Sequence, residues 1–300
     1  SRMQMKMNRN GHTMALGRAM SYFSDIGKYS DNVEGVGCYR FLCDLEENFE
    51  EKREDLIKTF QEILDYVLTK ENMIISFVGN KDGYTQFSQQ MEKFLADIPD
   101  KRKGEKPVAD ISVLEHGINE GLKNAGQVQY VARAGNFMKK GLSYHGALHI
   151  LKVILGYDYL WNNVRVKGGA YGCMCGFLQS GNAYLVSYRD PNLKETNDIY
   201  EHAYEYVQSF QASERDMTKY MIGAISNMDT PLTPSAKGSR SFNAYMSGIS
   251  EEYLQNIRNQ VLEVTQEDIR SLAPIIQALL EEKKICVIGN DKKIEENKEL

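Results

Sequence analysis

The chain has 300 residues, of which 42% are hydrophobic and 26% charged, and this balance is typical of a globular protein with a sizeable core. Its formal net charge of −5 argues against nucleic acid or an anionic membrane surface as the main partner, and no apolar run approaches the roughly 20 residues of a membrane span. The five cysteines are scattered, which suits a reducing compartment better than a disulfide framework.

Two segments of the chain repeat the same order of predicted elements. Residues 54–80 show helical spacing of apolar residues followed by the β-rich run Ile74–Asn80, and residues 267–290 repeat this order and end in Ile285–Asn290. Thr265 and Asp268 fit a capping box that starts the second helix. The second copy therefore has a long stretch of chain before it that the first copy lacks.

This repeat predicts one incomplete and one complete domain. We expect residues 1–104 to be the C-terminal half of one domain and residues 105–300 to be a whole domain. The boundary is predicted within Pro99–Pro107, a charged segment bracketed by prolines. On this interpretation the chain begins inside a domain.

Within the second domain, the elements are predicted in the following order. Alternation predicts a strand over 126–134, and apolar spacing predicts a helix over 144–162. Residues 171–178 and 183–189 are typical of an antiparallel hairpin, and residues 193–212 of a second helix. The Pro-containing segment 230–239 is predicted as a loop. Because strands come in pairs and helices in runs, an α+β fold with a mainly antiparallel sheet is expected.

Two groups of metal-ligating side chains are candidate sites. His145 and His149 are four residues apart on the predicted helix, a spacing that can ligate zinc. The glutamate of a zinc-protease helix is absent between them, and no third ligand is indicated. Cys173 and Cys175 share a strand face without a second pair of thiols. We expect no metal site in this chain.

The stretch Arg165–Gly172 combines two carbonyl-polarising side chains with a glycine-rich bend. Arg165 offers a guanidinium and Tyr171 a phenol, and Gly168 and Gly169 lie between them, where tandem glycine is typical of close approach by a ligand backbone. A guanidinium and a phenol aimed at one oxygen can stabilise a developing oxyanion. The plainer interpretation is a surface ion pair for Arg165 and a tyrosine packed on the sheet for Tyr171.

At this point the sequence resembles the C-terminal part of the presequence-protease branch of the pitrilysin/insulinase metallopeptidases. The resemblance covers essentially the whole chain. It is carried by Tyr159–Asn163, Arg165–Gly172, Ser187–Leu193, Gln127–Val131, Asp229–Leu232 with Pro234–Gly238, Cys286–Asn290, Ala19–Phe23 and Tyr39–Leu42.

The resemblance implies a zinc-dependent endopeptidase of four related α+β domains, whose two halves close around an unfolded peptide. Zinc and its H-x-x-E-H helix would belong to the N-terminal half, where a metal-bound water attacks the peptide carbonyl. The C-terminal half would supply an arginine and a tyrosine that bind the substrate carbonyl. Arg165 and Tyr171 match that pair in type, spacing and intervening glycines. Residues 1–104 and 105–300 would then belong to the third and fourth domains.

The expected partners are peptide substrates and the N-terminal half of the same polypeptide, and a partial domain with an apolar face can also pair with a second copy. Alone, the chain is expected to be inactive. The expected location is bacterial-type cytoplasm, or an organelle matrix if a targeting segment was removed. Two alternatives stay open: a non-catalytic peptide-binding or scaffold subunit, and a separate metal site at His145 and His149.

Overall fold

The computed structural model describes residues 2–103 and 119–300 and divides the chain into two compact units. Unit 1 comprises Ser1–Leu42, Ile111–Asp229 and Gln255–Leu300, and unit 2 comprises Cys43–Asp110 and Thr230–Leu254. The predicted boundary between residues 104 and 105 lies outside the described residues. The division into a partial and a complete domain therefore stays a prediction.

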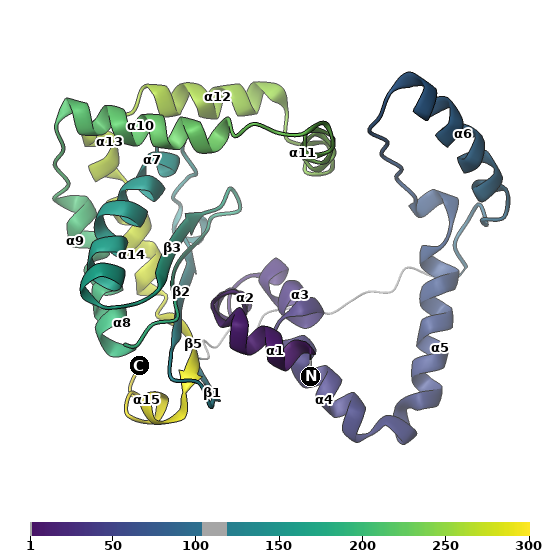
Figure 1. Cartoon of the computed structure of the whole chain (residues 1–300), viewed down its shortest axis with the longest axis horizontal. Coiled ribbons are helices and arrows are strands. Elements are labelled where there is room, and N and C mark those ends of the chain that lie inside the picture. The colour runs from purple at the N-terminus through teal and green to yellow at the C-terminus, as the bar shows by residue number, and fades with distance from the viewer. Residues whose placement is uncertain (1, 104–118) are drawn as a thin grey trace. The chain divides into compact units, whose positions relative to one another are not determined.

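Unit 1 is built on a five-stranded mixed sheet (Figure 1). Strand β1 runs parallel to β5, and the other neighbours are antiparallel, with Ala132 paired to Val186 on one side and to Cys286 on the other. The predicted α+β class with a mainly antiparallel sheet is confirmed. Across the sheet the strands are β1 (Glu120–Asn124), β5 (Lys284–Asn290), β2 (Tyr130–Asn136), β4 (Asn182–Tyr188) and β3 (Gly172–Phe177).

Helices from the second part of the chain cover one face of this sheet (Figure 1). Val131, Leu185 and Val287 point into this layer because successive side chains of a strand alternate between its faces. Each fully buried Leu or Ile contributes about 1.5–3 kcal/mol, so this large core dominates the stability of unit 1. The helices are α7 (Ala147–Ile154), η3 (Leu155–Lys167), α8 (Lys194–Glu201), α9 (Ala203–Gln208), α10 (Glu214–Met228), α13 (Gln266–Ser271) and α14 (Ala273–Glu281).

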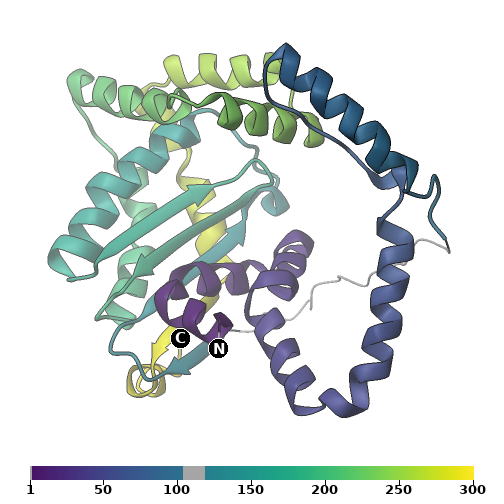
Figure 2. The same ribbon diagram turned by 45° about the vertical axis from the view of Figure 1, so that its right-hand side comes forward.

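The N-terminal helices α2 (Gly11–Met20) and α3 (Asp25–Glu34) pack on the opposite face, as Figure 2 shows from a second angle. Met14, Ala15 and Ala19 of α2 meet the strand residues that point away from the first layer, among them Ala132 and Ile288. The sheet is therefore buried on both faces.

A buried ion network fixes these N-terminal helices to the edge strand β1. Arg18 of α2 donates to Asp31 Oδ2 at 2.8 Å and to both carboxylate oxygens of Glu120. The Tyr22 hydroxyl donates to Glu120 at 2.9 Å, and Arg40 adds a further bond. The side chains of Arg18 and Asp31 are 9% and 0% exposed, so this pairing is shielded from water.

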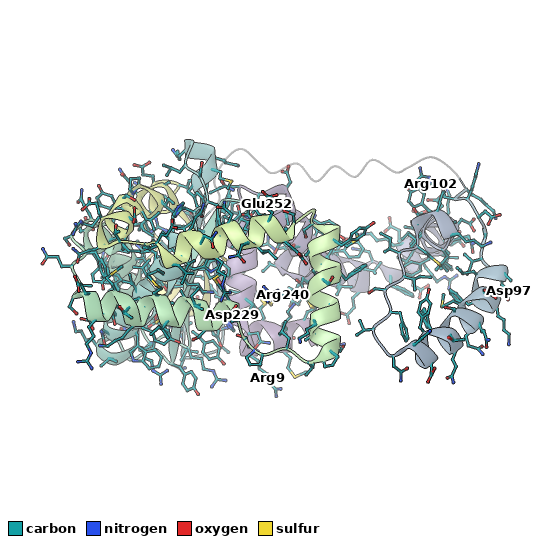
Figure 3. All side chains as sticks on the ribbon, turned by 90° about the horizontal axis from the view of Figure 1, so that it is seen from above. Arg9, Asp97, Arg102, Asp229, Arg240 and Glu252 are labelled. Atoms are coloured by element: carbon teal, nitrogen blue, oxygen red, sulfur yellow. The ribbon has the colours of Figure 1, made fainter. Side chains whose placement is uncertain are left out.

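Unit 2 contains α5 (Phe49–Val67), α6 (Lys81–Ala96) and α11 (Pro234–Met246). Arg102, labelled with Asp97 in Figure 3, donates to the Tyr66 hydroxyl at 2.9 Å and so joins the segment after α6 to α5. Many apolar side chains of α5 are exposed, among them Ile57, Phe60, Ile63 and Leu64. The remaining helices are α1 (Arg2–Arg9), α4 (Val36–Glu47), η1 (Lys70–Asn72), η2 (Phe137–Lys140), α12 (Glu251–Leu262) and α15 (Asp291–Glu295).

Most predicted elements are confirmed, with shifted ends. The strand predicted from 126 begins at Tyr130, the helix predicted to end at 162 continues to Lys167, and the helix over 193–212 is divided at His202. The repeated helix–strand unit at 267–290 is confirmed, as is the capping box of Thr265 and Asp268.

Two predictions are wrong. The run Ile74–Asn80 forms no strand with the described residues, because β-rich sequence needs a paired neighbour to become a strand. The predicted loop 230–239 already becomes helix α11 at Pro234. Thr233 caps that helix, and proline is well suited to a first helical position because its fixed φ fits and its missing N–H is not needed there.

Candidate functional site

The candidate site begins on the helix that leads into the edge strand β3. Helix α7 continues directly into η3, a π-helix, and Leu160 and Val164 anchor its inner side in the core. Trp161 and Arg165 lie one turn apart on the same helix, and Trp161 is partly exposed. Arg165 therefore lies on a helix, not within the predicted bend.

The glycines form the bend between η3 and β3. The Gly168 N–H donates to Asn163 O at 3.0 Å, and the Gly168 carbonyl accepts from the Asn192 amide at 2.6 Å. Gly169 has φ +83° and donates to Arg165 O at 2.9 Å, so it closes the helix end in a left-handed conformation. The tandem glycine thus has a structural role in the turn, which brings Tyr171 back alongside Arg165.

Replacing Gly169 with alanine is expected to lower the free energy of unfolding by about 1 kcal/mol, since an L side chain is strained at positive φ. The added methyl would meet only Pro191 Cγ at 3.5 Å, which is ordinary contact, so backbone strain and not a clash would cause the loss. Urea unfolding of this variant tests the expectation. Gly156→Ala is the matched control, because Gly156 is helical and a methyl there would meet open space. Equal stability of the two variants would contradict it.

Arg165 lies between two aromatic rings. Its Cζ atom is 4.0 Å from the centroid of the Trp161 ring and 5.6 Å from that of Tyr171. Stacking on Trp161 restricts the guanidinium to a few orientations. The structure thus brings Arg165 and Tyr171 together. Sequence reasoning missed Trp161, although a tryptophan four residues before an arginine on a predicted helix is the available signal.

Both polar groups of this pair lack a hydrogen-bonded partner among the described residues. No carboxylate of the described chain lies within ion-pair distance of Arg165, and the Tyr171 hydroxyl makes no hydrogen bond there. The Tyr171 side chain is 64% exposed. The site therefore presents one cationic and one neutral donor to an incoming group.

The Tyr171 ring is held by a cluster of aromatic side chains behind it. Tyr171 meets Tyr188 edge-on at 5.7 Å, and Tyr188 meets His12 of α2 edge-on at 4.7 Å and Tyr130 at 5.8 Å. Burial lowers the pKa of His12, so its ring favours the neutral form. Its Nδ1 atom is buried without a partner among the described residues. None of these contacts was predicted, because His12 is far from Tyr171 in the sequence.

The positive charge of Arg165 is not neutralised by the acid groups that surround the bend. Asp190 is completely buried and accepts from the Thr196 hydroxyl at 2.7 Å and the Asn192 N–H at 2.9 Å. Burial raises the pKa of this carboxyl, against those hydrogen bonds. Burial and Asp190 raise the pKa of Cys173 to about 11, although Arg165 acts in the opposite direction. Cys173 is therefore a neutral thiol and no nucleophile at neutral pH.

Residues 119–291, more than half of the chain, match the family model described as the PreP C-terminal domain. The chain belongs to this family. Residues 1–45 match a second model, described as a peptidase-associated region. The resemblance to the C-terminal part of presequence proteases is thereby confirmed.

Relatives of this PreP C-terminal domain chain extend the match to nearly its full length. Protein HypA of Clostridium perfringens is 40% identical over 291 residues, which are 97% of this chain and 29% of that protein. Presequence protease 1, chloroplastic/mitochondrial, of Arabidopsis thaliana is 29% identical over 280 residues, which are 93% of this chain and 26% of that protein. The chain thus spans less than a third of the length of these relatives. Among the described residues, no helix is long and apolar enough to cross a membrane.

The residues described in this PreP C-terminal domain chain do not fit a zinc ion. Within 2–103 and 119–300, no three His, Cys, Asp or Glu side chains lie close enough to share a metal. Helix α7 begins at Ala147, so His145 precedes the helix that was predicted to carry both histidines. His145 Nδ1 accepts from the Ala147 N–H at 3.1 Å, and His149 Nε2 lies 3.0 Å from the Tyr144 hydroxyl. Both rings thus have protein partners.

Proposed function

We propose that this chain is the C-terminal part of a zinc-dependent endopeptidase that degrades unstructured peptides, and that Arg165 and Tyr171 bind the carbonyl group to be cleaved. The observation that carries the proposal is the pair itself: an arginine without an acidic partner and an exposed tyrosine lie together at the end of edge strand β3. The presequence proteases among the relatives support the reaction class.

In this proposal the two donors act on charge that develops during the reaction. A peptide carbonyl oxygen becomes negative when its carbon is attacked, and Arg165 would supply a charge and Tyr171 a hydroxyl to that oxygen. The Trp161 ring holds the guanidinium before substrate arrives, which reduces the reorganisation needed on binding. Gly168 and Gly169 have no side chains to keep a peptide backbone away, and we propose that the substrate passes beside them.

The catalytic zinc would be held by the N-terminal half of the enzyme, since the described residues of this chain offer no ligand set. That half would also contribute the attacking water and its base. The exposed apolar side chains of α5 support the proposal that further polypeptide covers unit 2. We propose a location in bacterial-type cytoplasm or an organelle matrix.

The test is reconstitution of peptide hydrolysis from two parts. The chain alone is expected to cleave no unstructured peptide and to retain no stoichiometric zinc after dialysis. Hydrolysis should appear when a separately produced N-terminal half carrying the H-x-x-E-H helix is added, and it should disappear with a chelator. If the two halves associate but cleave nothing, the proposal fails and a non-catalytic peptide-binding subunit is the better assignment.

A further inference from the structure

Arg189 ends strand β4 in a backbone conformation that its turn does not explain. Its φ is +48°, and within the described ranges only Lys283 is another non-glycine residue with positive φ. The turn lets Asp190 and Gln129 exchange backbone hydrogen bonds of 2.9 and 2.6 Å, and it directs the Arg189 carbonyl to the Tyr171 N–H at 3.2 Å. A glycine would make the same turn without steric cost. The arginine side chain therefore calls for a second role.

That side chain lies against the aromatic cluster of the candidate site. The Arg189 Cζ atom is 5.5 Å from the centroid of the Tyr188 ring, and Tyr188 in turn meets Tyr171 edge-on. Arg189 also acts on the Tyr130 hydroxyl, where it opposes the rise in pKa that burial causes. Arg189 itself is exposed. It is thus a second guanidinium next to the Tyr171 ring system.

Neither Arg189 nor Arg165 has an acidic partner in the part of the chain that the structure describes. The neighbouring carboxylate, Asp190, is turned into the protein and is satisfied by Thr196 and Asn192. Other arginines of unit 1 are paired with carboxylates: Arg18, Arg133, Arg258 and Arg270. The two arginines of the site therefore keep their planar donors available to an anion.

We propose that Arg189 binds a carboxylate of the peptide, either its C-terminal carboxylate or an acidic side chain, while Arg165 and Tyr171 hold a backbone carbonyl. This inference rests on the proposed function, because it takes the same surface to bind peptides. A guanidinium offers two parallel N–H groups to a carboxylate, and such charge-assisted bonds are about twice as strong as neutral ones. The Tyr188 ring under Arg189 restricts the guanidinium to few orientations before binding.

The test compares three peptides of one unstructured sequence: one with a free C-terminal carboxylate, one amidated, and one amidated with an internal glutamine replaced by glutamate. Binding is followed through the fluorescence of Trp161, the only tryptophan of the chain, which lies 4.0 Å from Arg165, and through calorimetry. The free acid should bind about tenfold more tightly than the amide if Arg189 takes the C-terminus. The same gain in the glutamate peptide would identify an acidic side chain as the source.

Two variants separate binding from folding. Arg189→Gln and Arg189→Gly should both bind the acid and amide peptides equally, at the affinity of the wild type for the amide. Arg189→Gly should also unfold at the same or a higher urea concentration than the wild type, since glycine suits the positive φ. Arg215→Gln, at an exposed arginine of α10, is the control and should retain the preference.

The outcomes distinguish this inference from the function on which it rests. Equal binding of all three peptides by the wild-type chain, or a retained preference in Arg189→Gly, would overturn the carboxylate site while reconstituted hydrolysis still supports the peptidase. If no peptide changes the Trp161 signal or releases heat, the carboxylate site and the peptide-binding role of Arg165 and Tyr171 are both wrong.

Discussion

Replacing Arg165 with alanine or Tyr171 with phenylalanine is expected to lower the kcat of the assembled enzyme by about a hundredfold to a thousandfold, the usual loss for one donor of an oxyanion site. The effect should fall mainly on kcat because both groups meet the strongest charge on the oxygen after attack. The Arg165→Ala loss should be the larger, because that variant removes a full charge and also leaves the Trp161 ring without its stacked partner.

Steady-state hydrolysis of an unstructured peptide by the two reconstituted halves provides the measurement. The matched controls are Tyr157→Phe, at an exposed tyrosine of the same helix η3, and Arg215→Ala on α10, and both should retain wild-type kcat. The double variant of Arg165 and Tyr171 should lose less than the product of the two single losses, since both donors serve one oxygen. Wild-type rates in both single variants would remove these residues from the mechanism.

The elements that sequence predicts well are those whose cause is local. The hairpin of β3 and β4 follows from alternation of side chains around a short polar turn, and Gly181, at φ +84°, provides the left-handed residue of that turn. Helix α13 follows from the capping box of Thr265 and Asp268. In each case, residues close in sequence make the contacts that decide the conformation.

The elements that sequence mispredicts depend on contacts or signals that periodicity does not carry. Residues 74–80 have strand composition, but in unit 2 Phe77 stacks on Phe87 and Val78 packs against Gly238, so side-chain packing replaces sheet pairing. Helix α11 was mistaken for a loop because proline was interpreted as a breaker, whereas Thr233 before Pro234 is a helix start.

The candidate site shows the same division. Residue types alone indicate Arg165 and Tyr171, because few side chains polarise a carbonyl. Their supports were not predictable: Tyr188 and His12 reach Tyr171 through the packing of α2 on the sheet. The positive φ of Arg189 is likewise a consequence of the Asp190–Gln129 bridge between distant segments. Tertiary contacts, not local propensity, therefore complete the site.

Replacing Arg18 with methionine is expected to lower the free energy of unfolding of unit 1 by about 3–5 kcal/mol, because it leaves Asp31 and Glu120 without their shared cation in a shielded site. Methionine retains most of the apolar stem, so lost packing contributes little. The control is Arg258→Met, which breaks a partly exposed pair with Asp229 and should cost about 0–1 kcal/mol. Urea unfolding followed by Trp161 fluorescence reports on unit 1 for both variants, and equal losses would show that burial of the Arg18 network does not matter.

The same network predicts a specific dependence of stability on pH. Burial opposes ionisation of Glu120, but the hydrogen bonds from Arg18 and Tyr22 outweigh it and lower its pKa from 4.5 to about 2. Between these values the unfolded chain binds a proton that the folded chain does not. The contribution of Glu120 is therefore complete above pH 4.5 and decreases as the pH falls toward 2. Because other carboxylates titrate in this window, the test is the difference between the wild type and Glu120→Gln. That difference should shrink steadily below pH 4.5, and a constant difference from pH 6 to pH 2 would mean that Glu120 is not stabilised as an anion by Arg18.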